Sequence, residues 1–316
     1  MGHRLSLERI AAAMGQIDPV FLNTPQFRAE ALEAVLGCRL IVKVETLNPI
    51  RSFKGRGASL TLSKVEPGAT LVCASAGNFG QAMAYAARSR GVKQIIYASV
   101  NANPLKIARM RALGAEVRLH GEDFDAAKVE AKRFAAEAGL PLIEDSLEVA
   151  TDEGAGTIGL ELTRWPEPID ELLVSLGNGA LITGIGRWVK AHSPNTKVTA
   201  VSAKGAPAMV ESWRSGRIVE YDSINTIADG IGVRIPVPEA VKDMDGTVDD
   251  ALLVSDESTI AAMKLLHEHV GLIVEPSGAV GIAAILENPE RFRDRLVATV
   301  LCGSNLTPEQ IKQWLH

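Results

Sequence analysis

The chain has 316 residues, of which 47% are apolar and 4% aromatic, and its formal net charge is −5 at pH 7. This length suits one large or two modest α/β lobes, and the scarcity of aromatic side chains argues against an aromatic-rich β-sandwich. Charges of both signs are spread evenly without a basic run, so we expect no nucleic-acid partner. No apolar stretch reaches the roughly 20 residues that cross a bilayer, so we expect no membrane partner.

The N-terminal segment and the cysteines together favour a cytoplasmic protein. Residues 1–15 have the pattern of an amphipathic helix and lack the apolar block and cleavage site of a signal peptide. Cys38, Cys73 and Cys302 are far apart, and an odd number without paired spacing indicates a reducing compartment. The six histidines form no metal-binding motif, so we predict no metal site.

Along the chain, short β-branched runs alternate with longer helical stretches. Strands are predicted at 40–44, 70–73, 94–98, 116–119, 172–175, 198–202, 252–254 and 297–301. Helices are predicted at 78–90, 104–113, 123–138, 157–165, 258–270 and 277–288. Such alternation builds mainly parallel sheets that are covered by helices.

One compact strand-helix series predicts a division into two lobes. It runs from about 70 to 145 and lies between segments that look like parts of another sheet. We therefore predict a small substrate-gating domain, 70–145, inserted into a larger discontinuous domain, 1–69 and 146–316.

The first segment with chemical content is SFKGRGA, 52–58. Ser52 is expected to cap a helix that begins near Lys54. The positive end of a helix dipole disfavours an ammonium, so a lysine that is neutral or condensed with an aldehyde suits this position better. From this segment alone, an ordinary surface lysine beside Arg56 is the simpler interpretation.

Two polar turns follow predicted strands. Ser75, Gly77 and Asn78 form a turn whose backbone N–H groups are free to bind an anion such as a substrate carboxylate, although a simple helix cap explains them equally well. The second turn, 177–181, is glycine-rich and resembles a phosphate cradle in principle. It lacks the spacing of a dinucleotide or Walker motif, and a tight turn is the simpler interpretation.

Cys302 ends the predicted strand 297–301. In open parallel sheets, ligands bind at the carboxyl ends of the strands, so its thiol is a candidate ligand contact. A buried structural cysteine is the alternative.

Seven motifs follow one another along nearly the whole chain: NPIRSFKGRGA (48–58), SAGNFGQA (75–82), EGAGTIGLEL (153–162), SLGNGAL (175–181), TIADGIGV (226–233), EPSGAVGIAA (275–284) and CGSN (302–305). In this order they resemble the fold-type-II pyridoxal-phosphate family, specifically its serine/threonine dehydratase and serine racemase branch. The resemblance implies an α/β, tryptophan-synthase-β-like fold with two parallel-sheet lobes. It also implies pyridoxal 5′-phosphate as cofactor and a small amino acid as substrate. We further expect a homodimer.

The resemblance also assigns residue roles. Lys54 would hold the cofactor as a Schiff base and take the Cα proton, with Phe53 beside the ring and Cys302 at the pyridine nitrogen. One loop would receive the substrate carboxylate: Ser75, Ala76, Gly77 and Asn78, of which Asn78 also contacts the ring 3′-oxygen. A second loop would hold the phosphate through backbone N–H groups: Gly177, Asn178, Gly179, Ala180 and Leu181.

Two of these positions favour β-elimination. A thiol such as that of Cys302 is a poor partner for a pyridinium, which disfavours transamination. Ala76 occupies the position of the second base in the racemases, and alanine cannot transfer a proton. We therefore predict an ammonia-lyase (dehydratase) that converts a small β-hydroxy amino acid, such as threonine or serine, to a 2-oxo acid and ammonia. The alternatives are a racemase or β-replacement enzyme of the same fold, or a non-catalytic cofactor-binding relative.

The phosphate loop departs from the four glycines usual in this branch. Asn178 and Ala180 replace two of them. Alanine is strained at positive φ, whereas asparagine tolerates that conformation better. We expect phosphate binding to persist, with the Asn178 side chain adding a contact.

Other departures concern the surroundings of the site. The segment 202–208 lacks the acids of metal-activated relatives and contains Lys204, so we expect their divalent-metal site to be absent. Phe79 replaces a histidine common in relatives and either reshapes the substrate pocket or simply packs. Asp229 and Glu153 are polar candidates near the site, although a structural role as a cap or an ion-pair partner is the alternative for each. Because the chain ends at His316, we expect no regulatory domain.

Overall fold

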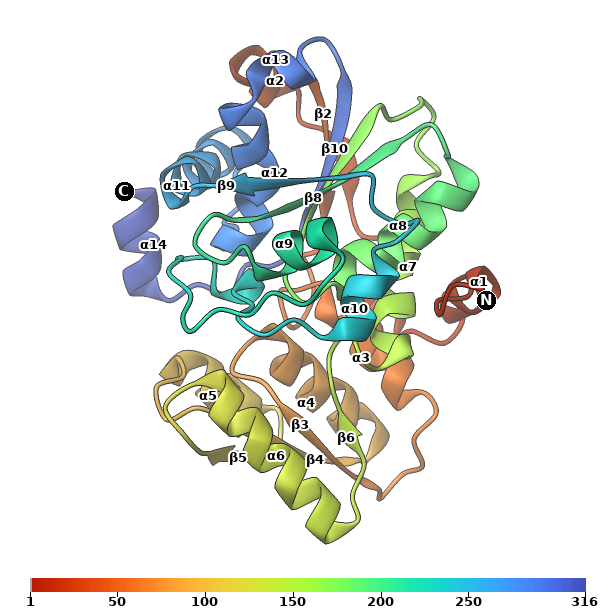
Figure 1. Ribbon diagram of the computed structural model, residues 1–316, viewed down its shortest axis with the longest axis vertical. Helices are drawn as coiled ribbons and strands as arrows, with labels where there is room; N and C mark the ends of the chain where they lie inside the picture. Colours follow the sequence, from red (N-terminus) through yellow and green to blue (C-terminus); the bar gives the residue numbers. More distant parts are fainter. Residues whose placement is uncertain (1) are drawn as a thin grey trace.

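The computed structural model describes residues 2–316, which form two helix-covered sheets, one below the other in Figure 1. The larger sheet has six strands, in the spatial order β1 (Gln26–Arg28), β2 (Arg39–Val44), β10 (Leu296–Leu301), β7 (Glu171–Ser175), β8 (Lys197–Ala203) and β9 (Asp250–Val254). The smaller sheet has four, in the order β5 (Glu116–Leu119), β4 (Lys93–Ala98), β3 (Thr70–Ala74) and β6 (Leu142–Ile143). Every neighbouring pair is parallel except β1 with β2. The predicted α/β class with two parallel sheets is confirmed.

Helices cover both faces of each sheet, so central strands such as β7 and β10 are buried along their whole length. One face of the larger sheet packs against α2 (Glu30–Leu36), α11 (Asp256–Leu265), α12 (Pro276–Glu287), α13 (Pro289–Phe292) and α14 (Pro308–Leu315). The other face packs against α7 (Val149–Leu162), α8 (Ala180–His192), α9 (Ala208–Ser215) and α10 (Pro238–Asp243). The smaller sheet lies between α6 (Phe124–Ala138) on one side and α3 (Lys54–Leu62), α4 (Asn78–Arg90) and α5 (Pro104–Ala112) on the other. The N-terminal α1 (Leu7–Ala13) packs on α7.

All of the predicted strands are present, with ends shifted by at most two residues. The sequence prediction missed β1 and β6, which have only three and two residues and are too short to show a period-2 pattern. The N-terminal helix predicted over 1–15 was too long. In the structure α1 begins only after Ser6, whose side chain caps it by accepting the N–H of Arg9.

Helix α7 was also predicted wrongly, because it begins at Val149 rather than at 157. Its glycines allow close contact with neighbouring helices. A Cβ atom on Gly154 would lie 2.6 Å from the Cα of Gly57 in α3, and one on Gly184 in α8 would lie 2.0 Å from the carbonyl of Asp152. The glycines therefore permit the tight packing of α3, α7 and α8.

The smaller sheet comes entirely from the predicted inserted segment, 70–145. Helix α3 precedes that segment in the chain but contributes Ala58, Leu60 and Leu62 to the core beside the smaller sheet. The exact domain boundaries therefore stay a prediction.

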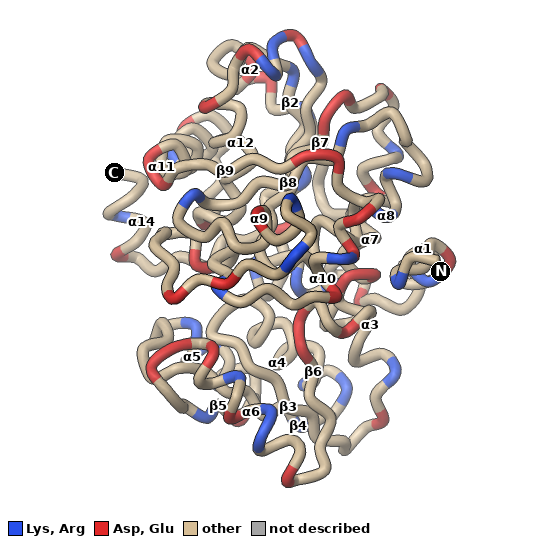
Figure 2. The backbone as a smooth tube through the Cα atoms, in the orientation of Figure 1, with Lys and Arg blue, Asp and Glu red and all other residues tan. Residues whose placement is uncertain are grey.

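Charges of both signs are interspersed along the backbone in the view of Figure 2. Within residues 2–316, no helix has the length and apolar character that a membrane crossing requires.

Candidate active site

A cavity of about 390 Å³ lies between the two sheets, and Lys54, Asn78, Gly179 and Cys302 all line it. These residues come from four motifs that are far apart in sequence. Each of the last three follows the end of a strand, β3, β7 or β10, so the topology brings the loops together at one site.

Lys54 is the first residue of α3. Its backbone N–H donates to the hydroxyl of Ser52 at 3.3 Å. The N-cap residue is Phe53, without a side-chain hydrogen bond, so the prediction that Ser52 caps this helix was wrong. The amino group lies 4.7 Å from the ring centroid of Phe53 and 6.0 Å from that of Phe79. Both rings are buried and line the cavity, so Phe79 does shape the pocket.

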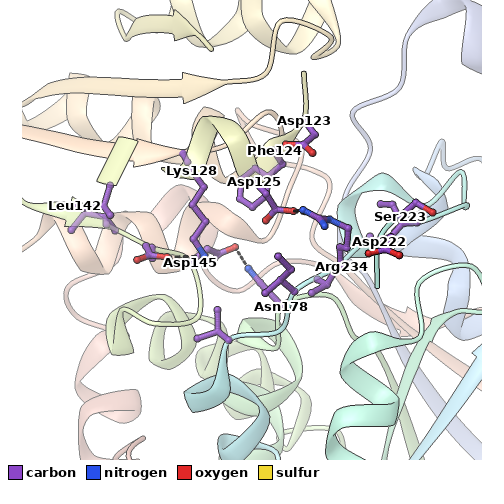
Figure 3. Close-up of a pocket in the computed structure, with 18 residues that line it drawn as sticks. Asp123, Phe124, Asp125, Lys128, Leu142, Asp145, Asn178, Asp222, Ser223 and Arg234 are labelled. Carbon is purple, nitrogen blue, oxygen red and sulfur yellow. Dashed lines mark hydrogen bonds and ion pairs between the residues drawn. The ribbon is translucent and has the colours of Figure 1, made fainter. Parts of the chain in front are cut away.

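The ammonium of Lys54 pairs with the carboxylate of Asp145, which follows β6. The same carboxylate oxygen, Oδ2, accepts a hydrogen bond from the side-chain amide of Asn178 at 2.5 Å (Figure 3). The other oxygen, Oδ1, is buried and accepts no hydrogen bond from any residue in the described range 2–316. The sequence interpretation missed Asp145 because its segment carries no recognisable motif.

The turn before α4 can bind an anion. The hydroxyl of Ser75 accepts the N–H groups of Gly77 and Gly80, at 3.2 and 2.9 Å, and so fixes the shape of the turn. The N–H groups of Ala76 and Asn78 donate to no acceptor among residues 2–316. Free donors at the start of a 13-residue helix favour a carboxylate.

The glycine-rich turn before α8 has a single residue with positive φ, Gly179, at +107°. Asn178 and Ala180, the two departures from the glycine pattern, do not adopt positive φ, so neither is strained. Ala180 is the first residue of α8. Within the described chain, the N–H groups of Gly177, Asn178 and Gly179 donate to no acceptor and are free for a phosphate. The Asn178 side chain donates to Asp145, and the expected contact from this side chain to a phosphate stays a prediction.

The thiol of Cys302 and the hydroxyl of Ser277 lie on the cavity wall and have only long hydrogen-bond contacts or none. The thiol of Cys302 lies 3.6 Å from the carbonyl of Ser277 and 3.8 Å from the hydroxyl of Ser175. Burial raises the pKa of the Cys302 thiol to about 12, so it is neutral at physiological pH. The hydroxyl of Ser277 is buried and has no partner within 2–316.

Both polar atoms of the Asn78 side chain are hydrogen-bonded. Its amide donates to Glu275 at 2.7 Å, and its carbonyl accepts from Asn305 at 2.8 Å. Glu275 also accepts the backbone N–H of Asn305 at 2.9 Å, and burial raises the pKa of this carboxyl. The motifs 275–284 and 302–305 thus orient Asn78, a role that the sequence interpretation did not assign.

Asp229, a candidate from the sequence, lines the cavity and pairs with Lys106 at 2.6 Å. Lys106 belongs to α5 beside the smaller sheet, so this ion pair joins the two halves of the site. Burial alone would lower the pKa of Lys106. The negative charges of Asp229 and Glu275 outweigh this effect, so the pKa of Lys106 is raised.

A family described as "Pyridoxal-phosphate dependent enzyme" matches residues 17–303. The chain belongs to this pyridoxal-phosphate family. It is 31% identical over 288 residues to L-threonine dehydratase biosynthetic IlvA of Pasteurella multocida (strain Pm70), an alignment that covers 90% of this chain but only 56% of that protein. It is 32% identical over 295 residues to a serine racemase of Oryza sativa subsp. indica, covering 91% of this chain and 85% of the racemase. The structure of maize serine racemase matches with a TM-score of 0.90 at 29% identity, over 98% of this chain and 96% of that one.

The predicted family and cofactor are therefore confirmed. The chain spans about half the length of the Pasteurella dehydratase. Identities near 30% to both dehydratases and racemases do not separate the two activities.

The residues around the cavity fit pyridoxal phosphate, the cofactor of this family. Lys54 offers a primary amine to an aldehyde, and the free N–H groups of 177–179 offer donors to a phosphate. The unpartnered hydroxyl of Ser277 and the neutral thiol of Cys302 offer uncharged partners to a ring nitrogen. The individual roles of these residues stay predictions.

Glu153 does not line this cavity, and of the two interpretations left open for it the structural one is confirmed. Its carboxylate accepts the backbone N–H of Ser6 at 2.8 Å and pairs with Arg9, so it anchors the N-terminal helix. Lys204 lies at the end of β8 and pairs with Glu287 at 2.9 Å. The absence of a divalent-metal site stays a prediction.

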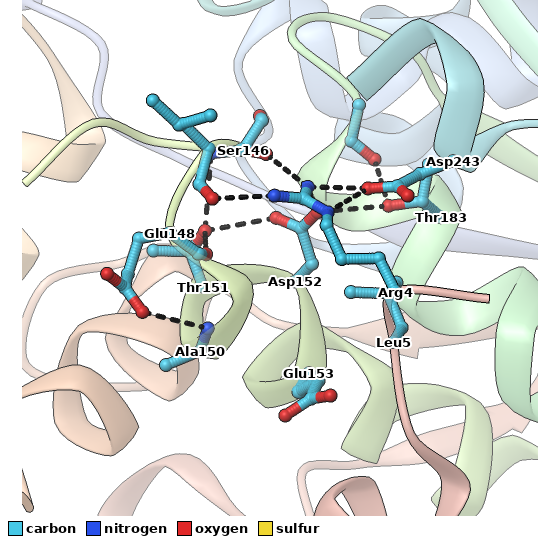
Figure 4. A network of polar contacts seen from close by, with 12 residues as sticks. Arg4, Leu5, Ser146, Glu148, Ala150, Thr151, Asp152, Glu153, Thr183 and Asp243 are labelled. Atoms are coloured by element: carbon cyan, nitrogen blue, oxygen red, sulfur yellow. Dashed lines mark hydrogen bonds and ion pairs between the residues drawn. The ribbon is translucent and has the colours of Figure 1, made fainter. Parts of the chain in front are cut away.

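The N-terminal segment binds the chain at Ser146, the residue that follows Asp145 in sequence (Figure 4). The guanidinium of Arg4 donates to the carbonyls of Ser146 and Leu147 at 2.7 and 2.6 Å, and to the carboxylate of Asp243 at 2.8 Å. Ser146 has φ of +69°, a conformation that disfavours serine. Arg4 therefore holds a strained turn beside the partner of Lys54.

Proposed function

We propose that this protein is a pyridoxal-phosphate-dependent ammonia-lyase that removes the hydroxyl group from the β-carbon of a small amino acid, such as threonine or serine. The products are a 2-oxo acid and ammonia. The observation that carries the proposal is Ala76 on the cavity wall, in the loop that would receive the substrate. A methyl group cannot donate or accept a proton, which leaves Lys54 to act at Cα.

Each step of the proposal uses groups that line the cavity. The N–H groups of Ala76 and Asn78 bind the substrate carboxylate and orient Cα. The cofactor, when bound, supplies an electron sink for the charge that develops at Cα. The amine of Lys54 takes the Cα proton.

The neutral thiol of Cys302 supports elimination over transamination. A carboxylate beside the ring nitrogen favours its protonated form. An uncharged partner such as this thiol does not. Charge at Cα is then best dispersed by loss of a leaving group from Cβ. The burial of Cys302 and its raised pKa, about 12, support this part of the proposal.

Racemisation is the second candidate, because serine racemases of Oryza sativa and maize are among the similar proteins. It needs a proton donor on the face opposite Lys54. The proposal for Ala76 therefore predicts that racemisation is slow and that Ala76→Ser raises it. β-Replacement and cofactor binding without catalysis are lesser alternatives.

The test is a panel of β-hydroxy amino acids that includes L- and D-serine, L- and D-threonine and their allo forms. Release of ammonia and a 2-oxo acid supports the lyase. An inverted amino acid as the main product, without 2-oxo acid, would contradict it. A β-substituted amino acid formed in the presence of a thiol would indicate replacement instead.

We also propose a homodimer in a reducing compartment such as the cytoplasm. The three cysteines are buried and unpaired, which suits a reducing environment. Light scattering of the purified protein tests the dimer.

A further inference from the structure

Asp145 is a cavity carboxylate that the proposed elimination does not use. In this structure its Oδ2 binds the Lys54 ammonium and the Asn178 amide, while Oδ1 is buried without a donor from any described residue. Its side chain is only 14% exposed. When Lys54 condenses with an aldehyde, its primary ammonium is lost. Asp145 then loses the hydrogen bond from that ammonium and keeps the neutral Asn178 donor, and a sheltered carboxylate short of donors is unfavourable.

A second cavity, of about 360 Å³, is lined by the residues drawn in Figure 3. The two share Asp145 and Asn178, together with the apolar side chains of Phe124, Ile224 and Val233. Asp145 therefore lies on the wall that the two cavities share. The additional volume accommodates a substrate side chain longer than that of threonine.

The cations on the wall of this second cavity are already paired. Arg234 binds Asp125 at 2.5 Å, and Lys128 binds Glu144 at 2.8 Å. In the described chain, no other lysine or arginine lines this cavity, whereas Asp222 and Asp145 do. A negatively charged side chain would thus meet no free cation, and a positively charged one would meet Asp145.

We propose that Asp145 selects a substrate whose side chain carries an ammonium group beyond Cβ. This inference rests on the proposed elimination and narrows its substrate to a β-hydroxy amino acid with a second, distal amine. The ammonium takes the place of Lys54 on Asp145, and the free Oδ1 supplies an additional acceptor. Such a bond is charge-assisted and partly sheltered from water, so it favours a cationic ligand over a neutral one of similar shape.

The test compares two ligands that have no leaving group on Cβ, L-2,4-diaminobutyrate and L-2-aminobutyrate. Their dissociation constants are measured by calorimetry on the cofactor-loaded protein. We expect the diamine to bind about tenfold more tightly to the wild type. Asp145→Asn should bring the two constants together, whereas Asp222→Asn, an isosteric change on the wall of the second cavity, should preserve the difference.

Equal affinities for the two ligands in the wild type would overturn the inference. So would a preference for the diamine that survives Asp145→Asn. If that variant does not fold, Asp145→Ser replaces it and is judged by the same outcomes. Neither ligand carries a β-hydroxyl, so this result is independent of whether the lyase proposal holds.

Discussion

Lys54 and Asp145 are 91 residues apart in sequence and form an ion pair in the wall of the central cavity. Lys54 starts a helix, and Asp145 ends the short connection after β6. The pair joins the lysine of the proposed chemistry to a turn that depends on Arg4. We therefore expect a change in the turn at Ser146 to alter the contact between Asp145 and Lys54.

Arg4→Gln should loosen the turn beside Asp145. The substitution removes charged hydrogen bonds to two backbone carbonyls and to Asp243, so we expect a loss of about 2 kcal/mol in the free energy of unfolding. Urea denaturation measures this loss. Arg9→Gln is the control. The Arg9 side chain is 51% exposed, so this substitution should lower the free energy of unfolding by less than Arg4→Gln does.

Strain at Ser146 gives a second check on Arg4. Glycine accepts the φ of +69° that serine resists, so Ser146→Gly should recover part of the stability lost in Arg4→Gln. If the double variant is no more stable than Arg4→Gln alone, Arg4 does not act by holding this turn.

Gly179→Ala should weaken cofactor binding. Alanine at a φ of +107° costs about 1–2 kcal/mol, and the loop can avoid the strain only by moving its N–H groups. Titration of the cofactor-free protein with pyridoxal phosphate measures the affinity. Gly216→Ala is the matched control, because Gly216 has φ of +67° at the end of α9, away from the cavity. Equal affinities in the two variants would show that the turn does not hold the phosphate.

Arg56→Met should destabilise the helix that carries Lys54. Arg56 is fully buried and donates to Glu45 at 2.9 Å and to Glu161 at 2.7 Å. Removing it leaves two buried carboxylates short of a cation, for which we expect a loss of about 3–5 kcal/mol in the free energy of unfolding. Arg39→Met breaks an exposed pair with Glu167 and should lose at most about 1 kcal/mol. Similar losses in the two variants would argue against this ranking.

The Cys302 thiol should make stability depend on pH in the alkaline range. Burial raises its pKa from 9.0 to about 12, so the folded state keeps a proton that the unfolded state has released. The contribution of this thiol to the free energy of unfolding is fully present below pH 9. It is lost as the pH rises from about 9 to about 12. Cys302→Ser should therefore flatten the decline in the free energy of unfolding over that window, as measured by denaturation at a series of pH values. An unchanged slope would contradict the neutral, buried thiol.

The sequence predicted those parts of the site that lie within single motifs. Lys54, the turn before α4, the glycine-rich turn and Cys302 each follow a local pattern, and the strand topology brings them to one cavity. Asp145 and Arg4 could not be found in this way, because their roles depend on contacts between segments far apart in the chain. Glu153 was a candidate for the site because it belongs to a motif. Its side chain faces α1 rather than the cavity, which a motif does not show.

The proposed elimination depends most directly on Lys54. The decisive measurement is the rate of 2-oxo acid formation by the wild type and by Lys54→Ala with the best β-hydroxy amino acid of the panel. We predict that the variant loses about 10³-fold or more of this rate, because no other group removes the Cα proton. A Lys54→Ala protein that forms the 2-oxo acid at the wild-type rate would contradict the account.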